Sequence, residues 1–276
     1  MKKKLLIALG CSYTEGVGCY GDFNPNDPNL TENDENILTT RYHTYGWPLA
    51  LTKKLGYDKL INIGIRGSST SGQIKKLFEI YYEEPFEEYD VTIIWLLTQP
   101  SRISFYTNGR ITNLMPHLPI KELEHLRNKE SIATAYVDFI QDIDTDPVLE
   151  QLFHIKCMEQ YCENNNYSLI IANTDLLSDS LLKYFHKSKY YLSPNPVSVL
   201  TELDNDTDFA FCGHPNELGY EKVSEIIFKL LSDNHSSLKN ETPTESVKWE
   251  WRGELLQWML FNKNMKFKLK DFKYSN

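Results

Sequence analysis

The sequence contains no apolar run that approaches the roughly 20 residues needed to span a bilayer. The start, "MKKKLLIALGCS", is basic like a signal peptide, but its apolar run ends after about six residues and no small-residue cleavage site follows. We therefore interpret residues 4–10 as a first β-strand. We expect a cytoplasmic protein without a transmembrane segment.

An excess of basic residues is also absent. The chain has 29 lysines and arginines against 38 aspartates and glutamates, which gives a net charge of −9. Proteins whose main task is to bind a nucleic-acid backbone usually need a basic face. We therefore expect no nucleic-acid partner.

Cysteine is scarce, with five residues scattered over 276 positions. An odd, dispersed set does not indicate a disulfide framework. Cys157 and Cys162 lie on one expected helix, but no further Cys/His pair completes a zinc pattern. We expect buried free thiols and no bound metal.

Apolar runs rich in β-branched residues alternate with helical patterns along most of the chain. The runs lie at 4–10, 59–65, 91–97 and 167–174, and the helical patterns at 45–56, 68–84, 146–166 and 214–233. Nearly continuous apolar strands indicate a parallel sheet buried on both faces, and the alternation indicates right-handed βαβ units. The sequence therefore predicts a three-layer α/β/α domain over 1–232, with a mostly parallel sheet of about five strands.

Two insertions and a tail interrupt this pattern. The polar insertion at 19–44 and the one at 98–145 could build substrate walls or only decorate the surface. Within the second, Asn108-Gly109 between alternating residues predicts a hairpin, with helical segments after it. Residues 233–246 have the composition of a linker, and the basic aromatic segment 247–276 is expected to dock on the domain or to join two subunits in a homo-oligomer; a membrane surface or another partner is the alternative.

The first expected strand runs directly into "GCSYTEGVG", a turn rich in glycine and hydroxyl groups. Ser12 stands there between a strand end and a helix start, where it could be a nucleophile or only a helix cap. Cys11 precedes it, and adjacent residues in such a turn point in different directions. Only one of the two can face a crevice, and a small buried Cys11 is the alternative to a reactive one.

Other polar and glycine residues follow the next strands. Asn62 and Gly67 lie in "NIGIRGSSTSG", Gln99 and Arg102 in "LLTQPSR", and His214 in "CGHPNELGY", just before an expected helix. In a parallel sheet the binding crevice lies beyond the carboxyl ends of the strands. A histidine placed there late in the chain is a candidate base for Ser12.

These residues resemble the blocks of the SGNH/GDSL hydrolases over roughly 4–232. The nucleophile block matches Gly10-Cys11-Ser12, the oxyanion-hole glycine matches Gly67, and "HPNELGY" matches the histidine block. The form "GCSYTEGVG" is similar to small SGNH-like proteins, many of them encoded by phages. The resemblance implies a flavodoxin-like SGNH hydrolase fold.

Two positions depart from the family pattern. Gln99 stands where the third block usually has an oxyanion-binding asparagine. Phe211 stands three residues before His214, where the family has its triad aspartate, and the nearest acid upstream is Asp208. Either Asp208 loops back to His214, or a backbone carbonyl takes its role, or the site works as a Ser–His dyad.

The resemblance implies a serine esterase that acts on a small-molecule, carbohydrate or lipid ester without a metal or organic cofactor. Ser12 and His214 would be catalytic, with Asp208 as the candidate acid. Gly67 and Gln99 would hold the oxyanion, and Asn62 and Arg102 are further candidate substrate-binding residues. The alternative is a catalytically weak or inactive SGNH-fold binding or assembly protein. A nucleotide-binding protein is a third interpretation, but "GCSYTEGVG" matches neither the dinucleotide fingerprint nor a P-loop.

Overall fold

The computed structural model describes residues 2–25, 27–100, 102–107, 110–114, 147–173, 190 and 203–237. The helical segments expected after the hairpin and the basic aromatic tail at 247–276 lie outside these residues. The chain divides into two compact units, Met1–His235 and Ser236–Asn276, and all described elements belong to the first except the last two residues of its final helix. None of the described helices is both long and apolar enough to cross a membrane.

The centre of the first unit is a sheet of four parallel strands. They are β1 (Lys3–Gly10), β2 (Lys59–Gly64), β3 (Tyr89–Leu97) and β6 (Ser168–Asn173), in the order β2-β1-β3-β6. All three pairings are parallel. This confirms the mostly parallel sheet predicted from the sequence. The prediction was about five strands, and the described part of the chain contains four of them.

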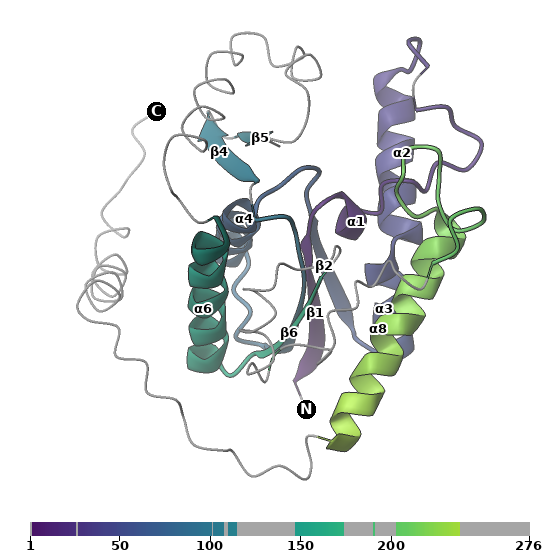
Figure 1. Cartoon of the computed structure of the whole chain (residues 1–276). Helices are drawn as coiled ribbons and strands as arrows, with labels where there is room; N and C mark the ends of the chain where they lie inside the picture. The colour runs from purple at the N-terminus through teal and green to yellow at the C-terminus, as the bar shows by residue number, and fades with distance from the viewer. Residues whose placement is uncertain are drawn as a thin grey trace. The chain divides into compact units, whose positions relative to one another are not determined.

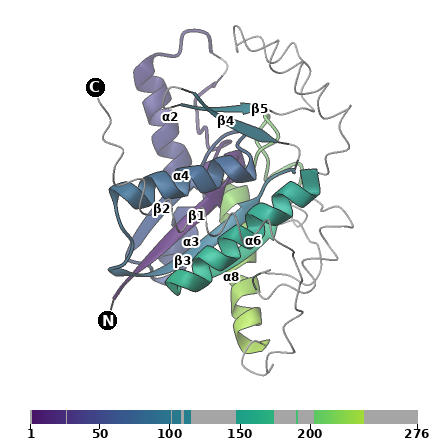
Figure 2. The same ribbon diagram turned by 90° about the vertical axis from the view of Figure 1, so that its left-hand side faces the viewer.

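Helices cover both faces of this sheet (Figures 1 and 2). One face carries α4 (Thr70–Glu83) and α6 (Pro147–Asn165), and the other carries α2 (Glu32–Tyr45), α3 (Trp47–Leu55) and α8 (Glu217–Ser237). Side chains of β1 alternate between the two resulting cores, with Leu6 in one and Leu5 in the other, both fully buried. This confirms the three-layer α/β/α architecture.

The helix ends follow the sequence signals. Pro48 lies in the first turn of α3, and Gly56 ends that helix in a left-handed conformation with φ of 68°. Ser69 precedes α4 and its hydroxyl accepts the backbone N–H of Gly72. Helix α8 ends at Ser237, so it runs into the first residues of the expected linker.

Both insertions contain ordered structure. In the first, Thr31 and Asp34 form a capping box that starts α2, and Leu38 and Tyr42 pack into the core. Part of this insertion therefore packs against the domain rather than decorating its surface. In the second, β4 (Ile103–Thr107) and β5 (Arg110–Leu114) pair antiparallel, which confirms the predicted hairpin.

The strand order places a topological switch point at β1, which pairs with β2 on one side and β3 on the other. A buried polar chain holds this edge together. The Trp95 indole donates to Gln73 Oε1 (2.6 Å), Gln73 Nε2 donates to Ser68 Oγ (3.0 Å), and Ser68 Oγ donates to the carbonyl of Gly10 (3.3 Å). The loop before α4 is thereby fixed to the end of β1.

Replacing Gln73 with alanine tests this chain. The change removes the acceptor of the buried Trp95 indole N–H and one of the two partners of the Ser68 hydroxyl. We therefore expect a loss of about 2–4 kcal/mol in the free energy of unfolding. Urea denaturation measures it. The matched control is Gln160→Ala, which removes only a solvent-exposed bond to Asn164 and is expected to cost less than about 0.5 kcal/mol. Equal losses in the two variants would contradict the assignment.

Candidate active site

Ser12 opens a short helical turn at the carboxyl end of β1. Helix α1 (Ser12–Glu15) closes with the N–H groups of Thr14 and Glu15 donating to the carbonyl of Cys11 (2.9 and 3.0 Å). A Cβ at Gly64 would lie 2.1 Å from the Glu15 nitrogen, so only glycine lets β2 end this close to the turn. The Cys11 side chain is buried, and Ser12 is the residue of the pair that faces the histidine.

His214 is presented by a tight reversal of the chain before α8. Phe209 and Pro215 form an antiparallel bridge, and the N–H of Ala210 donates to the carbonyl of His214 (2.8 Å). The Nε2 atom of His214 lies 2.8 Å from Ser12 Oγ. Gly18, with φ of 112°, permits this approach, because a Cβ there would lie 2.2 Å from the carbonyl oxygen of Pro215. The structure thus brings the predicted nucleophile and base together.

The rest of "HPNELGY" fixes α8 against the nucleophile turn. Asn216 accepts the N–H of Gly219 through Oδ1 (3.0 Å) and donates from Nδ2 to the carbonyl of Thr207 (2.8 Å). The buried hydroxyl of Tyr220 donates to the carbonyl of Val17 (2.8 Å) and lies 3.4 Å from that of Ser12. Sequence reasoning did not assign Tyr220 a role, although the Gly-aromatic pair of the motif was the signal for it.

The imidazole ring of His214 is oriented by two neighbours. Its Nδ1 atom lies 3.4 Å from Cys212 Sγ, and the backbone of Cys212 makes a hydrogen bond with the ring. The Tyr13 ring packs beside it at a centroid distance of 4.8 Å. With Nδ1 protonated toward Cys212, Nε2 presents its lone pair to the Ser12 hydroxyl.

Asp208 does not reach this histidine. Both oxygens of its buried carboxylate accept from Lys222 Nζ at 2.7 Å, and one also accepts the N–H of Asp204 at 2.7 Å. These bonds, with the Lys222 hydrogen bond as the largest cause, lower the pKa of Asp208. The candidate acid therefore ties the chain reversal to α8 instead of orienting His214. Phe211, at the family's acid position, is 68% exposed.

The pKa of His214 is lowered from its ordinary value of 6.5. Burial is the largest cause; the hydrogen bond with Cys212 opposes it, and the charges of Arg102 and Arg66 add to it. No carboxylate is among these groups. The lowered pKa favours the neutral imidazole, which is the form that a general base requires.

The other predicted residues divide into two groups. The loop that contains Gly67 (φ of 66°) is held at the end of β1 by the Ser68 hydroxyl. The turn that contains Gln99 and Arg102 follows β3 at the same edge, and Arg102 N donates to the carbonyl of Gln99 (3.3 Å). Asn62, by contrast, uses its side chain for the framework. Its Nδ2 donates to the carbonyl of Thr14 (3.1 Å) and its Oδ1 accepts the N–H of Gly64 (2.9 Å), so this amide joins β2 to the Ser12 turn. Its role in substrate binding stays a prediction.

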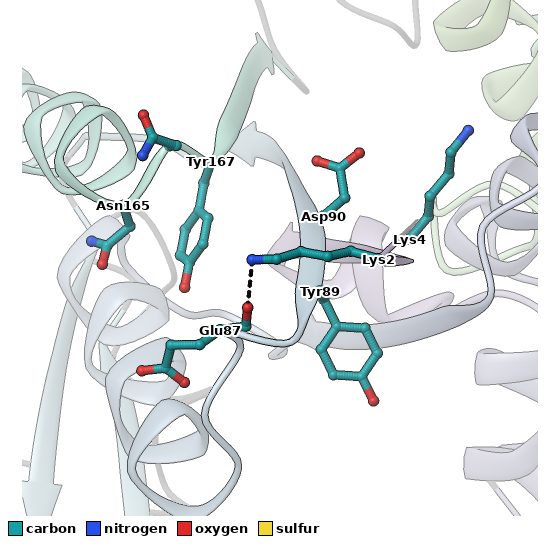
Figure 3. A pocket seen from close by; sticks show the side chains of 8 residues that line it. Lys2, Lys4, Glu87, Tyr89, Asp90, Asn165 and Tyr167 are labelled. Carbon is teal, nitrogen blue, oxygen red and sulfur yellow. Dashed lines mark hydrogen bonds between the residues drawn. The ribbon is translucent and has the colours of Figure 1, made fainter.

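A hollow of about 480 Å³ lies at the opposite, amino-terminal edge of the sheet (Figure 3). Its lining includes Lys2, Lys4, Asp90 and Tyr167, and Lys2 Nζ donates to the carbonyl of Glu87 (2.6 Å). It is separated from Ser12 by the whole length of β1, about 25 Å. We therefore take the Ser12 edge, where a serine hydroxyl lies beside a histidine, as the candidate active site. Across the described ranges, no group of three or more His, Cys, Asp or Glu residues could hold a metal ion.

The comparisons with known proteins concern the fold. No protein-family model matches the chain, and no curated protein matches it. Among solved structures it is similar to the lipase Lip_vut3 from a goat rumen metagenome, with 16% identity and a TM-score of 0.43 over 83% of this chain and 97% of that one. It is also similar to a protein described as lipolytic and of the G-D-S-L family from Desulfitobacterium hafniense DCB-2, with 14% identity and a TM-score of 0.30 over 83% and 99%.

The architecture is consistent with the SGNH hydrolase-like fold expected from the sequence. Four parallel strands lie between two helical layers, with the Ser12 turn after β1 and His214 before α8. Both TM-scores are below 0.5. The function proposed below is therefore argued from the geometry of the Ser12 edge alone.

The titration of His214 tests the electrostatics of the site. We expect its imidazole resonances to titrate with a midpoint below 6.5, and Arg102→Gln to move that midpoint upward because one nearby positive charge is removed. NMR measures both, with the resonance assigned by its absence in His214→Asn. Since the folded pKa lies below the unfolded one, the linked stability is complete above pH 6.5 and is lost as the pH falls through the folded pKa. A midpoint above 6.5 would contradict this description.

Proposed function

We propose that this protein is a serine hydrolase that cleaves esters by acyl transfer to Ser12. The observation that carries the proposal is the 2.8 Å approach of His214 Nε2 to Ser12 Oγ at the carboxyl edge of the sheet. A serine hydroxyl is a weak nucleophile and needs an adjacent base within hydrogen-bond reach. A neutral histidine at this distance meets that need.

In the first half-reaction Ser12 Oγ attacks the ester carbonyl while His214 Nε2 accepts the hydroxyl proton. The tetrahedral intermediate collapses as the C–O bond to the alcohol breaks, and His214 returns the proton to the leaving alkoxide. In the second half-reaction water attacks the acyl-enzyme carbonyl while His214 Nε2 accepts a proton from that water. The bond between the acyl carbon and Ser12 Oγ then breaks, His214 returns the proton to Oγ, and the carboxylic acid is released. Atoms and charge balance without an external cofactor.

The oxyanion would be held by groups at three neighbouring strand ends. The backbone N–H groups of Ser12 and Gly67 are the main candidates, and the side-chain amide of Gln99 is the third. The Gln99 amide replaces the family's asparagine on an arm one methylene longer. Removing one such donor typically costs about 10²–10³ in rate.

Among the described residues, no carboxylate pairs with the imidazolium formed during the reaction. Asp208 is engaged by Lys222, and His214 is oriented by Cys212 and Tyr13 instead. These contacts keep the orientation of the His214 ring. Without a carboxylate, however, the positive charge of the buried imidazolium is stabilised less than in a full triad. We therefore propose a dyad with slow turnover on simple esters. The same observation favours the alternative, a catalytically weak or inactive binding protein on this scaffold.

Hydrolysis of 4-nitrophenyl acetate by variants separates these assignments. We expect Ser12→Ala and His214→Ala each to abolish turnover above the uncatalysed rate. Asp208→Asn is expected to lower kcat by less than about tenfold, whereas loss of a triad acid costs on the order of 10⁴. The matched control is Asp206→Asn, an exposed acid of the same loop, and circular dichroism verifies that every variant folds.

Three results would overturn parts of the proposal. An unchanged rate in Ser12→Ala would remove the nucleophile. A loss near 10⁴ in a folded Asp208→Asn would show that Asp208 completes the triad. A wild-type protein that turns over no ester would leave the binding-protein alternative.

A further inference from the structure

The turn after β3 is fixed at both ends beside the Ser12 edge. At one end Gln151 Nε2 donates to the carbonyl of Thr98 (2.7 Å) and to Thr70 Oγ1 (3.0 Å). At the other end Ser104 Oγ accepts the N–H of Ser69 at 2.9 Å. Ser69 follows Ser68, whose hydroxyl bonds the carbonyl of Gly10. Arg102 lies between these two anchors, so its position is set by the same loop that holds the end of β1.

The guanidinium of Arg102 carries polar atoms that nothing in the described residues satisfies. Its Nε and Nη1 atoms are buried and have no hydrogen-bond partner. Thr98 Oγ1, on the same turn, is also buried without a partner. Burying unpaired donors of a cation is costly, so these donors need an acceptor from outside the described residues, such as an ordered water or a bound anion.

The other arginines with described side chains differ from Arg102 in this respect. Arg41 pairs with Glu217 at 2.8 Å and Arg66 pairs with Glu15 at 2.9 Å. Within the described part of the chain, no carboxylate pairs with Arg102 in this way. Among the described residues, the charge of Arg102 is therefore not neutralised by an ion pair.

That charge reaches the proposed base. Arg102 is among the groups that lower the pKa of His214, and no acid is among those that raise it. When His214 accepts the serine proton, a second positive charge forms near the first. An anion bound to Arg102 would offset both charges, and the substrate would then supply a negative charge that no described carboxylate supplies to His214.

We propose that Arg102 binds an oxyanion of the substrate, so that the preferred ester carries a carboxylate or phosphate group near its scissile carbonyl. The planar guanidinium fork matches both groups bidentately. The inference rests on the proposed hydrolase function and narrows its substrate class.

Paired substrates test the proposal on the full chain. Mono-4-nitrophenyl glutarate carries a carboxylate on its acyl chain, and 4-nitrophenyl pentanoate is its neutral counterpart with the same leaving group. We expect the wild type to favour the anionic ester by about ten- to hundredfold in kcat/KM, the range of one charge-assisted interaction. Arg102→Gln is expected to remove this preference, Arg102→Lys to keep part of it, and the control Arg41→Gln to keep it in full.

A binding measurement separates this inference from the proposed function. Isothermal titration of Ser12→Ala with glutarate, inorganic phosphate and neutral glutaramide requires no turnover. We expect glutarate or phosphate to bind, which also tells carboxylate from phosphate recognition, and glutaramide not to bind. Adding Arg102→Gln is expected to abolish the binding.

The outcomes are distinct. Ester turnover without a preference for the anionic substrate, or a preference that survives Arg102→Gln, overturns the role of Arg102 and leaves the hydrolase intact. If no ester is turned over, the hydrolase proposal fails and the titration alone decides whether Arg102 binds an oxyanion. Failure of both anions to bind Ser12→Ala overturns it.

Discussion

The contact between Ser12 Oγ and His214 Nε2 joins residues 202 positions apart, and much of the described structure serves to hold it. Ser12 follows β1, which lies between β2 and β3 at the switch point of the parallel sheet. Tyr220 ties α8 to the carbonyls of the nucleophile turn, and Gly18 lets the chain before α8 approach that turn closely. Tyr220 and Gly18 both set the position of the backbone around the site. The site therefore depends on packing as much as on the two reacting side chains.

Much of the fold could be predicted from the sequence, because its periodicity is unambiguous. The strands near 4–10, 91–97 and 167–174 bury side chains on both faces, whereas the strand near 59–65 is mostly half-buried. Continuous apolar runs of this kind leave few alternatives to a parallel sheet. The pairing of Ser12 with His214 followed from strand-end logic together with the histidine block. Helix α2 was missed, because its polar sequence buries only Leu38 and Tyr42.

Side-chain partners could not be predicted in the same way. Asp208 was a candidate acid by sequence distance alone, but Lys222 on α8 binds its carboxylate, and α8's rotation is not readable from a motif. The hydrogen bonds of the Asn62 amide to Thr14 and Gly64 likewise carried no signal in the sequence. The backbone of Cys212 near His214 also carried no sequence signal, because any residue there has the same backbone. Tertiary packing decides which hydrogen-bond partner each of these groups takes.

The most direct test of the central claim is to ask whether Ser12 is chemically activated by His214. The full chain is treated with a fluorophosphonate at pH 7.5, digested, and the modified residue is located by mass spectrometry. We expect one adduct, on Ser12, which is lost in His214→Ala although Ser12 is still present. An adduct on another residue, or labelling of Ser12 at the same rate without His214, would contradict it.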